Sequence, residues 1–238
     1  MAAPTDPHQN RLLAALPEDC WPRWKSLLEL VPMPLGRVLY ESGIPLTHAY
    51  FPTSAIVSLE FITENGSSAE VAMVGHEGLV GIPLFMGDGS TPGRAVVQSA
   101  GEGFRLAARA LREEFRQSAP VMSLMLRYTQ ALIAHMAQTA VCNRYHTLEK
   151  QLCRWLLLSL DRHPTNEIAV TQEQISHMLG VRREGITEAA LALQRADLIR
   201  YRRGNVTVID RAGLEERCCE CYNVVKAEYD RLLPGDQH

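Results

Sequence analysis

The stretch from Thr171 to Asp210 constrains the fold of this chain most, because it specifies two short helices and the turn between them. Thr171 is a favoured helix N-cap, and Gln174 three positions later can complete a capping box. One apolar face follows at helical spacing, formed by Ile175, Met178 and Leu179. Gly180 then stands where a helix commonly ends in left-handed backbone. We therefore predict a helix that begins after Thr171 and ends at Gly180.

A second helix is predicted to start almost at once. Its buried stripe is formed by Ile186, Ala189, Ala190, Leu193, Ala196, Leu198 and Ile199. Two helices joined so tightly are typical of a helix-turn-helix, in which the first residues of the second helix face base edges in the major groove. The exposed residues of that opening are Arg182, Arg183, Glu184 and Glu188. Arginine can bind guanine and glutamate can accept from cytosine, while Thr171 and Gln172 are predicted to hold phosphates.

Residues 201–209 form two β-prone runs around a Gly204-Asn205 turn, which predicts the wing of a winged helix-turn-helix. Arg202 and Arg203 at its tip are expected to lie against the sugar-phosphate backbone of double-stranded DNA. The alternative is a helical hairpin whose arginines are merely solvated. The order of cap, glycine, arginines and wing favours the DNA-binding interpretation.

This segment is basic, but the chain as a whole is not. Residues 171–211 carry seven arginines against five acidic side chains, a net charge of +2, within a chain of net charge −3. So weak a field argues against tight nonspecific binding of polyanions. It favours a few well-placed contacts, doubled by dimerisation.

Length and composition agree with a globular protein of two small domains. The chain has 238 residues, of which 46% are hydrophobic and 21% charged. No apolar run is long enough for a membrane span and the N-terminus lacks a signal-like core, so we expect a cytoplasmic protein with no membrane partner. The six cysteines do not form the pattern of a disulfide framework.

The first half of the chain predicts a sensor-like domain. Residues 1–30 suggest a helical arm with Leu12, Leu13, Leu16, Trp24, Leu27 and Leu28 as its apolar face. Short β-like runs follow, broken by glycine and proline: Val38–Tyr40, Ile56–Ile62, Ala69–Val74, Ala95–Ser99 and Phe104–Ala107. Asn65-Gly66 marks a hairpin. This spacing predicts a compact antiparallel barrel or roll within residues 1–119.

A long helix is predicted from Pro120 to Tyr145, and residues 120–146 are expected to form a dimerisation helix and hinge. One stripe has the spacing of a two-stranded coiled coil and is assigned to the dimer interface: Val121, Met125, Tyr128, Leu132, His135, Thr139 and Cys142. A second stripe is expected to pack on the roll: Met122, Leu126, Ile133, Met136 and Ala140. The alternative is a core helix of a single chain. Residues 147–238 complete the DNA-binding domain, beginning with a helix that carries Leu148, Leu152, Trp155, Leu156 and Leu160.

The order of roll, long helix and winged helix-turn-helix resembles the Crp-Fnr superfamily of bacterial transcription regulators. The resemblance covers nearly the whole chain and implies an α+β fold with a cyclic-nucleotide-binding-like N-terminal roll. It further implies a homodimer on a palindromic operator, and contact with RNA polymerase if the protein is an activator. Family members commonly read bases with Arg, Glu and a further Arg one turn later. Arg183 and Glu184 match the first two, whereas Glu188 replaces the last.

The sensor departs further from the family. Members that bind cyclic AMP engage the ribose with Gly-Glu and the cyclic phosphate with Arg followed by Ser or Thr. Here the matching residues are Gly81-Ile82 and Arg94-Ala95, so that Gly81 and Arg94 remain as effector-pocket candidates. An isoleucine cannot accept the ribose hydroxyl, and an unmet buried polar group costs about 1–3 kcal/mol. We predict no cofactor, and we expect any nucleotide effector to differ from cyclic AMP.

Other sensing chemistries stay open. An N-terminal iron-sulfur cluster is not expected with Cys20 alone. Cys218, Cys219 and Cys221 lie in a predicted helical segment from Leu214 to Leu233 and can bind a soft metal or respond to oxidants. A helix there points Cys219 away from the other two, which favours buried small side chains and no metal site.

Heme sensing needs an axial ligand, for which His48, His76 and His135 are the candidates. The His76-Glu77 turn lies between two glycines, and its role stays open. A different class, the cupin-type metal enzymes, also uses a β-roll. That class needs a paired histidine motif, which is missing here, and no nucleophile–base set or phosphate-binding glycine loop suggests another enzyme.

Overall fold

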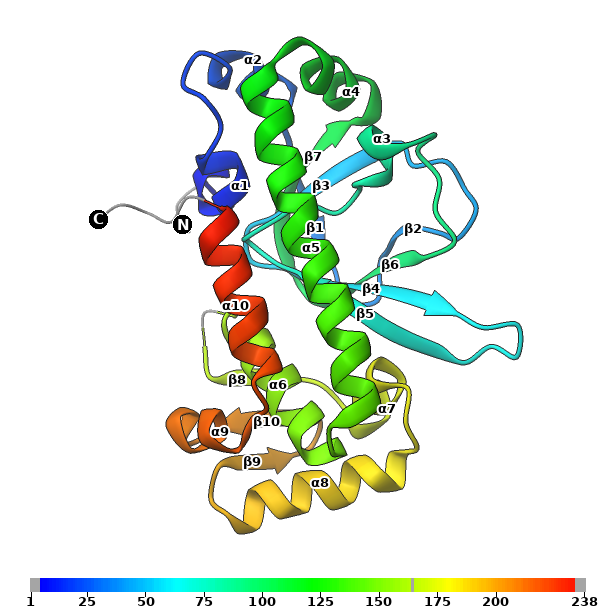
Figure 1. The fold of residues 1–238 in the computed structure, drawn as a ribbon, viewed down its shortest axis with the longest axis vertical. Helices are drawn as coiled ribbons and strands as arrows, with labels where there is room; N and C mark the ends of the chain where they lie inside the picture. Colours follow the sequence, from blue (N-terminus) through cyan, green and yellow to red (C-terminus); the bar gives the residue numbers. More distant parts are fainter. Residues whose placement is uncertain (1–4, 164, 234–238) are drawn as a thin grey trace. The chain divides into compact units, whose positions relative to one another are not determined.

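The computed structural model describes residues 5–163 and 165–233 (Figure 1). The fold is α+β, as predicted. The described residues group into two compact units. The roll unit comes from the described parts of Met1–Leu59, Met73–Ile133 and Ala227–His238, and the helix-turn-helix unit from Glu60–Ala72 and Ala134–Lys226. The division at residues 119 and 146 stays a prediction.

The strands of the N-terminal half form two sheets. One has the order β1-β7-β3 and the other β2-β6-β4-β5. Their bounds are β1 Glu29–Met33, β2 Val38–Tyr40, β3 His48–Pro52, β4 Ile56–Ile62, β5 Ser68–Val74, β6 Arg94–Ser99 and β7 Gly101–Ala107. The five predicted strands are confirmed. The missed strands, β1 and β3, flank β7 at the two edges of their sheet, where proline is tolerated because one side of the strand needs no ladder hydrogen bond.

Short helices cover the ends of the roll: η1 Pro7–Gln9, α1 Arg11–Ala14, α2 Trp21–Leu27, α3 Pro83–Met86 and α4 Ala108–Gln117. The predicted helical arm is therefore broken into pieces. Leu12 and Trp24 are fully buried, but Leu27 of the predicted apolar face is exposed. The Trp24 indole donates to Glu114 Oε2 at 3.1 Å, and this carboxylate also pairs with Arg23. These contacts fasten α2 to α4.

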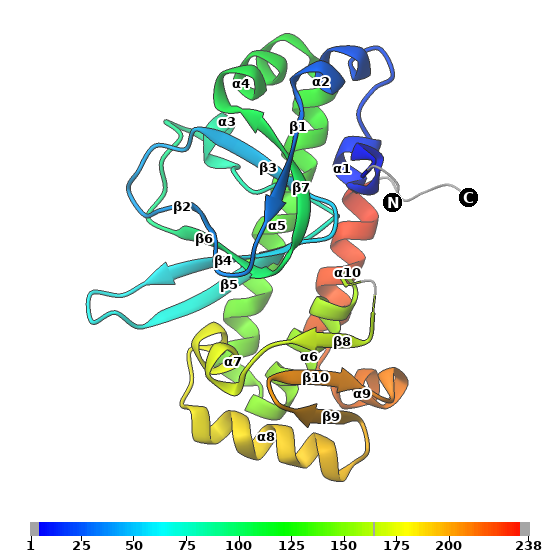
Figure 2. The same ribbon diagram turned by 180° about the vertical axis from the view of Figure 1, so that it is seen from behind.

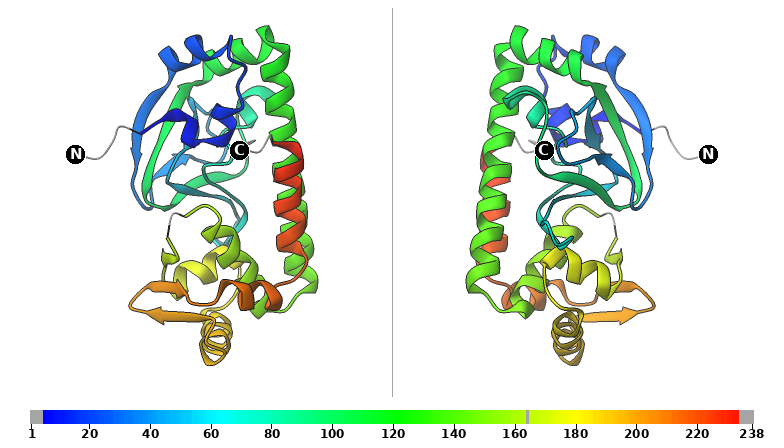
Figure 3. Two further views of the ribbon diagram at one scale, coloured as in Figure 1. Left: turned by 90° about the vertical axis from the view of Figure 1, so that its left-hand side faces the viewer. Right: turned by 90° about the vertical axis from the view of Figure 1, so that its right-hand side faces the viewer.

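The long helix α5 spans Ala119–Tyr145, within one residue of its prediction (Figure 3). The assignment of its two stripes was wrong. The residues predicted for the dimer interface are all buried within the single chain: Val121, Met125, Tyr128, Leu132, His135, Thr139 and Cys142. The stripe predicted to pack on the roll instead exposes Met122, Leu126 and Ile133. Both stripes are apolar, so periodicity alone did not distinguish inside from outside.

Tyr128 shows why this face turns inward. Its hydroxyl donates to the Leu79 carbonyl oxygen at 2.7 Å, and its ring lies directly against Gly78. A Cβ added to Gly78 would fall 2.2 Å from the Tyr128 ring. Tyr128 is therefore part of the core of the roll unit.

The helix-turn-helix unit contains the remaining elements: α6 Leu148–Leu160, β8 Glu167–Ala169, α7 Gln172–Leu179, α8 Arg183–Arg195, β9 Ile199–Arg202, β10 Asn205–Val208 and α9 Arg211–Arg217, with the start of α10 Cys221–Leu232. The sheet has the order β8-β10-β9 (Figure 2). Helix α6 is buried from Gln151 to Leu160 and contacts both α8 and α9. It forms the core on which the unit is built.

The predicted C-terminal helix from Leu214 to Leu233 is divided. Helix α9 ends at Arg217, Cys218 has extended backbone, and α10 begins at Cys221. The Asp210 side chain caps α9 by accepting from the Gly213 N–H at 3.0 Å. Across the described residues, no helix is both long and apolar enough to cross a membrane.

Replacement of Gly78 by alanine tests the packing of α5 on the roll. The added methyl group displaces the Tyr128 ring, so the free energy of unfolding is expected to fall by about 1–3 kcal/mol. Gly87→Ala is the matched control, because nothing lies within 4 Å of its Cβ position. Urea denaturation measures both. Equal stabilities of the two variants would contradict the close contact of Gly78 with Tyr128.

Candidate nucleic-acid interface

The first helix of the predicted motif has the local structure that its sequence dictates. The Thr171 N–H donates to Gln174 Oε1 at 2.8 Å, and the Gln174 N–H donates to Thr171 Oγ1 at 3.2 Å. These two bonds complete the capping box. Gly180 ends α7 with left-handed backbone, at φ 65° and ψ 34°. The predicted start, end and turn of α7 are therefore confirmed.

The second helix, α8, presents its polar opening turn to solvent. Arg182 is its N-cap, and Arg183, Glu184 and Glu188 are exposed with it. The opposite face is buried through Ile186, Ala189, Ala190 and Leu193, as predicted. Ala196, Leu198 and Ile199 were also assigned to this helix, but they follow its last residue, Arg195. The structure therefore brings the four predicted base-reading residues onto one accessible helix end.

The two phosphate-binding candidates on α7 differ in how they are used. Gln172 Oε1 accepts from the Thr187 hydroxyl at 2.9 Å, which ties the start of α7 to α8 and leaves the Gln172 amide N–H groups as donors. The Thr171 hydroxyl already donates to Gln174 Oε1 at 2.9 Å. Gln172 therefore keeps free donors on its side chain, whereas the Thr171 hydroxyl is used in the cap of α7.

The wing is a tight hairpin whose turn lies one residue earlier than predicted. Arg202 pairs with Asn205, so the two loop residues are Arg203 and Gly204. Both have positive φ, 48° and 79° respectively, as a two-residue turn of type I′ requires. Arg202 and Arg203 are both exposed. The predicted location of these arginines at the tip of the wing is confirmed.

Sequence reasoning missed the residues that attach the wing to α8. Gln194 Oε1 accepts from the Tyr201 N–H at 2.9 Å, and the Tyr201 hydroxyl donates to the Val170 carbonyl oxygen at 2.9 Å. Burial raises the pKa of Tyr201 to about 12, an effect that nearby Arg183 opposes, so the hydroxyl stays protonated at neutral pH. Because these partners come from three segments, no local pattern identifies them.

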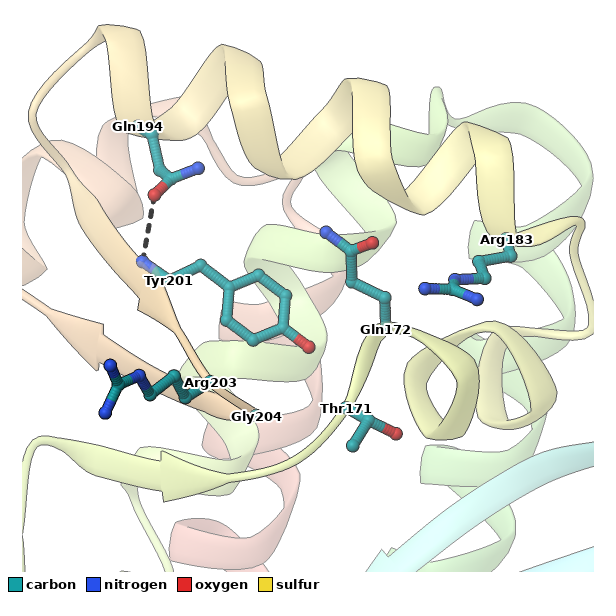
Figure 4. A pocket seen from close by; sticks show the side chains of 7 residues that line it. All are labelled: Thr171, Gln172, Arg183, Gln194, Tyr201, Arg203 and Gly204. Carbon is teal, nitrogen blue, oxygen red and sulfur yellow. Dashed lines mark hydrogen bonds between the residues drawn. The ribbon is translucent and has the colours of Figure 1, made fainter.

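A pocket of about 330 Å³ lies between the two helices and the wing (Figure 4). It is lined by Thr171, Gln172, Arg183, Gln194, Tyr201, Arg203 and Gly204. The Arg183 and Arg203 side chains lie on opposite sides of Gln172 and Tyr201. Two cations and an amide donor around one concave surface provide suitable partners for phosphate oxygens.

The effector-pocket candidates lie in the roll unit. Gly81 is buried with φ 128°, and a Cβ there would meet Ala49 Cα at 3.3 Å. Ile82, which replaces the family's glutamate, is the N-cap of α3. Arg94 opens β6 and is half-buried. The close contact with Ala49 gives Gly81 a packing reason that needs no ligand.

The histidine candidates have different environments. Burial lowers the pKa of His48, and Arg105 adds to the effect. Burial, with Arg162 and Arg154 nearby, holds the pKa of His135 well below its usual value, so this imidazole is neutral. In the His76-Glu77 turn, the Glu77 carboxylate accepts from the Gly75 N–H at 3.2 Å. The Glu77 side chain therefore closes its own turn.

The structure also assembles a cluster that sequence reasoning missed. Cys142 and His146 come together with Cys219 and Cys221, and among the described residues this is the group of His, Cys, Asp or Glu side chains spaced to hold a metal ion. The expectation that Cys219 points away from Cys221 was wrong, because the chain between them is a turn and not a helix. The signals in the sequence are the Cys-x₃-His and Cys-x-Cys spacings.

Comparison with known proteins supports the assignment of the motif. The family of Crp-like helix-turn-helix domains matches residues 150–217. A comparison with curated proteins finds no match. Among solved structures, FixK2 from Bradyrhizobium japonicum has 13% identity and a TM-score of 0.68, over 81% of this chain and 98% of that chain.

Two further structures share the fold. A Crp/FNR-family transcriptional regulator from Thermus thermophilus has 20% identity and a TM-score of 0.64, over 79% of this chain and 97% of that chain. The c-di-GMP responsive global regulator CLP from Xanthomonas campestris has 15% identity and a TM-score of 0.64, over 82% of this chain and all of that chain. Residues 150–217 therefore form a Crp-like helix-turn-helix domain, and the chain shares the fold of these proteins, one of which is a transcriptional regulator of the Crp/FNR family.

Proposed function

We propose that the protein is a cytoplasmic homodimer that binds a palindromic operator in double-stranded DNA through the opening turn of α8. The observation that carries this proposal is the exposure of Arg182, Arg183 and Glu184 at that turn, with Glu188 exposed one turn later. Arg183 binds a guanine edge and Glu184 accepts from a cytosine amino group, while Arg182 and Glu188 adjust the preference. Glu188 cannot donate to a base, so the half-site differs from that of relatives with arginine there.

The wing and α7 hold the DNA backbone. Arg202, Arg203 and Gln172 donate to phosphates, and these contacts position the protein without reading sequence. Thr171 contributes indirectly, because it caps α7 and so fixes the start of that helix. The protein regulates transcription, and RNA polymerase is a further partner if it acts as an activator.

Dimerisation uses the exposed stripe of α5, formed by Met122, Leu126 and Ile133, in place of the buried stripe. Three large apolar side chains on one face of a surface helix are typical of a helix-helix interface. A dimer places two copies of α8 about one DNA turn apart, which explains the palindromic operator.

The roll senses an effector other than cyclic AMP. Ile82 at the start of α3 offers no acceptor to a ribose hydroxyl, and Gly81 packs against Ala49. The responsiveness of the Xanthomonas campestris regulator to c-di-GMP makes that nucleotide the first to test. Cyclic AMP is the control ligand, and we expect it not to bind. Calorimetric titration of the full chain compares the binding of the two nucleotides.

Two arginine variants separate base reading from phosphate binding. Arg183→Ala is expected to lose about 1–3 kcal/mol per half-site on the operator and little on scrambled DNA. Arg202→Ala is expected to weaken both DNAs alike and to reduce the salt slope by about one per protomer. Fluorescence anisotropy with DNA upstream of the protein's own gene measures both.

Arg195→Ala is the control for these variants, because Arg195 is an exposed arginine in the last turn of α8. Its affinity for both DNAs should match that of the unmodified protein. Equal losses on operator and scrambled DNA for Arg183→Ala would show that Arg183 does not read bases.

Ile133→Glu tests the proposed dimer face. Ile133 is 52% exposed, so a charge there leaves the folded chain intact but must be buried without a partner in the dimer. We expect the dimer to weaken by at least about tenfold in sedimentation equilibrium. Met86→Glu, at a residue 53% exposed in α3, is the control. A dimer of unchanged strength in Ile133→Glu would place the interface elsewhere.

A further inference from the structure

Four metal-ligating side chains from two segments of the helix-turn-helix unit converge at one point. Cys142 lies in the last turn of α5, and His146 follows the end of that helix. Cys219 precedes α10, and Cys221 begins it. The two segments are 73 residues apart in sequence, yet the ligand atoms of all four residues lie within 4.8 Å of one another. We call this set the Cys₃His cluster.

The spacing of the donor atoms suits one tetrahedral metal ion. The sulfurs of Cys142 and Cys219 are 3.6 Å apart, and the Cys221 sulfur is 3.4 Å from His146 Nδ1. Zinc bonds of about 2.3 Å to sulfur and 2.0–2.1 Å to nitrogen give tetrahedral edges of about 3.8 and 3.6 Å. These two edges therefore need only small adjustments to hold Zn²⁺, and none of the other edges exceeds 4.8 Å.

Local backbone structure explains how each pair is presented. Cys142 and His146 are separated by one helical turn, and the His146 N–H donates to the Cys142 carbonyl oxygen at 3.0 Å. Cys219 and Cys221 are brought to the same side by the turn between α9 and α10. Within that turn, the Tyr222 N–H donates to the Cys219 carbonyl oxygen at 3.3 Å. The division of the predicted C-terminal helix is what makes this arrangement possible.

Polar groups around the cluster orient its members. Glu220 Oε1 lies 3.4 Å from His146 Nε2, on the opposite side of the ring from Cys221. A carboxylate there keeps the proton on Nε2 and leaves the Nδ1 lone pair directed at the cluster, as is common for histidine ligands of zinc. Gln138 Nε2 also donates to the Cys221 sulfur at 3.1 Å. Such bonds stabilise sulfur as a thiolate.

One buried cation lies near the cluster. Arg154 is 3% exposed, and its charge acts on Cys142. A zinc ion with three thiolates carries a net charge of −1, which Arg154 balances.

We propose that Cys142, His146, Cys219 and Cys221 form a closed structural site for Zn²⁺, which fastens the corner between α5 and α6 to the corner between α9 and α10. Four protein ligands leave no open position, so the ion has a structural role and no catalytic one. The three thiol protons are released to solvent when the ion binds. The site lies outside the DNA-contacting surface and does not depend on the operator assignment.

The unmodified full-length protein provides the first test, which needs no variant to fold. After chelation under reducing conditions, one Zn²⁺ per chain is expected to bind and to raise the thermal unfolding midpoint. Co²⁺ in place of Zn²⁺ should give the thiolate charge-transfer and strong visible bands of a tetrahedral site. Zinc should protect Cys142, Cys219 and Cys221 from alkylation, as mapped by mass spectrometry, while the alkylation of Cys153 and Cys218 stays unchanged.

Variants then assign the ligands. Cys142→Ser and Cys219→Ser are expected to lower zinc affinity by more than about 100-fold, measured against a competing chelator, and Glu220→Gln by about 10–100-fold. Cys153→Ser is the control for a buried thiol, and Cys218→Ser for an adjacent one. Both should bind zinc as the unmodified protein does.

Three results would overturn the proposal. The first is binding of less than one zinc ion per ten chains at a small excess of metal. The second is a cobalt spectrum without thiolate charge-transfer bands. The third is a protection pattern that includes Cys218 in place of Cys219 or Cys221.

Discussion

Burial of one face of α8 determines which of its residues can meet DNA. Ile186 and Leu193 are fully buried, and burial of such side chains is worth about 1.5–3 kcal/mol each. Gly185 allows the close approach to α6, since a Cβ there would lie 2.8 Å from Leu148 Cδ2. With this face fixed against α6 and α7, the arginines and glutamates of the first turn have one orientation available, toward solvent. The wing then depends on the same helix through Gln194 and Tyr201.

The DNA-binding half was predictable because its determinants are local. The capping box of Thr171 and Gln174 and the left-handed Gly180 involve residues within a few positions of each other, and each has one favourable conformation. The wing turn was misplaced by one residue because Arg203, a poor residue for positive φ, occupies the first loop position, where Gly204 was expected. Residues held in such strained backbone conformations cluster at functional sites. A phosphate contact gives a reason for a charged side chain at Arg203 despite its unfavourable backbone conformation.

The orientation of α5 and the Cys₃His cluster were not predictable from local pattern. Both stripes of α5 are apolar, and the polar members of the buried one find partners only in the folded chain. The Thr139 hydroxyl donates to the His135 carbonyl oxygen at 3.0 Å and accepts from the Arg154 guanidinium at 3.0 Å. The cluster likewise depends on a contact between residues 142 and 219, and on the break between α9 and α10. Tertiary contacts decided both outcomes.

Selection of bound sequences from a random DNA pool by the full-length protein tests whether two copies of α8 read an operator. We predict enrichment of an inverted repeat whose half-site centres lie one helical turn, about 10 base pairs, apart. We also predict loss of that enrichment in Arg183→Ala. No enriched motif, with equal recovery of random fragments, would show that α8 does not read sequence.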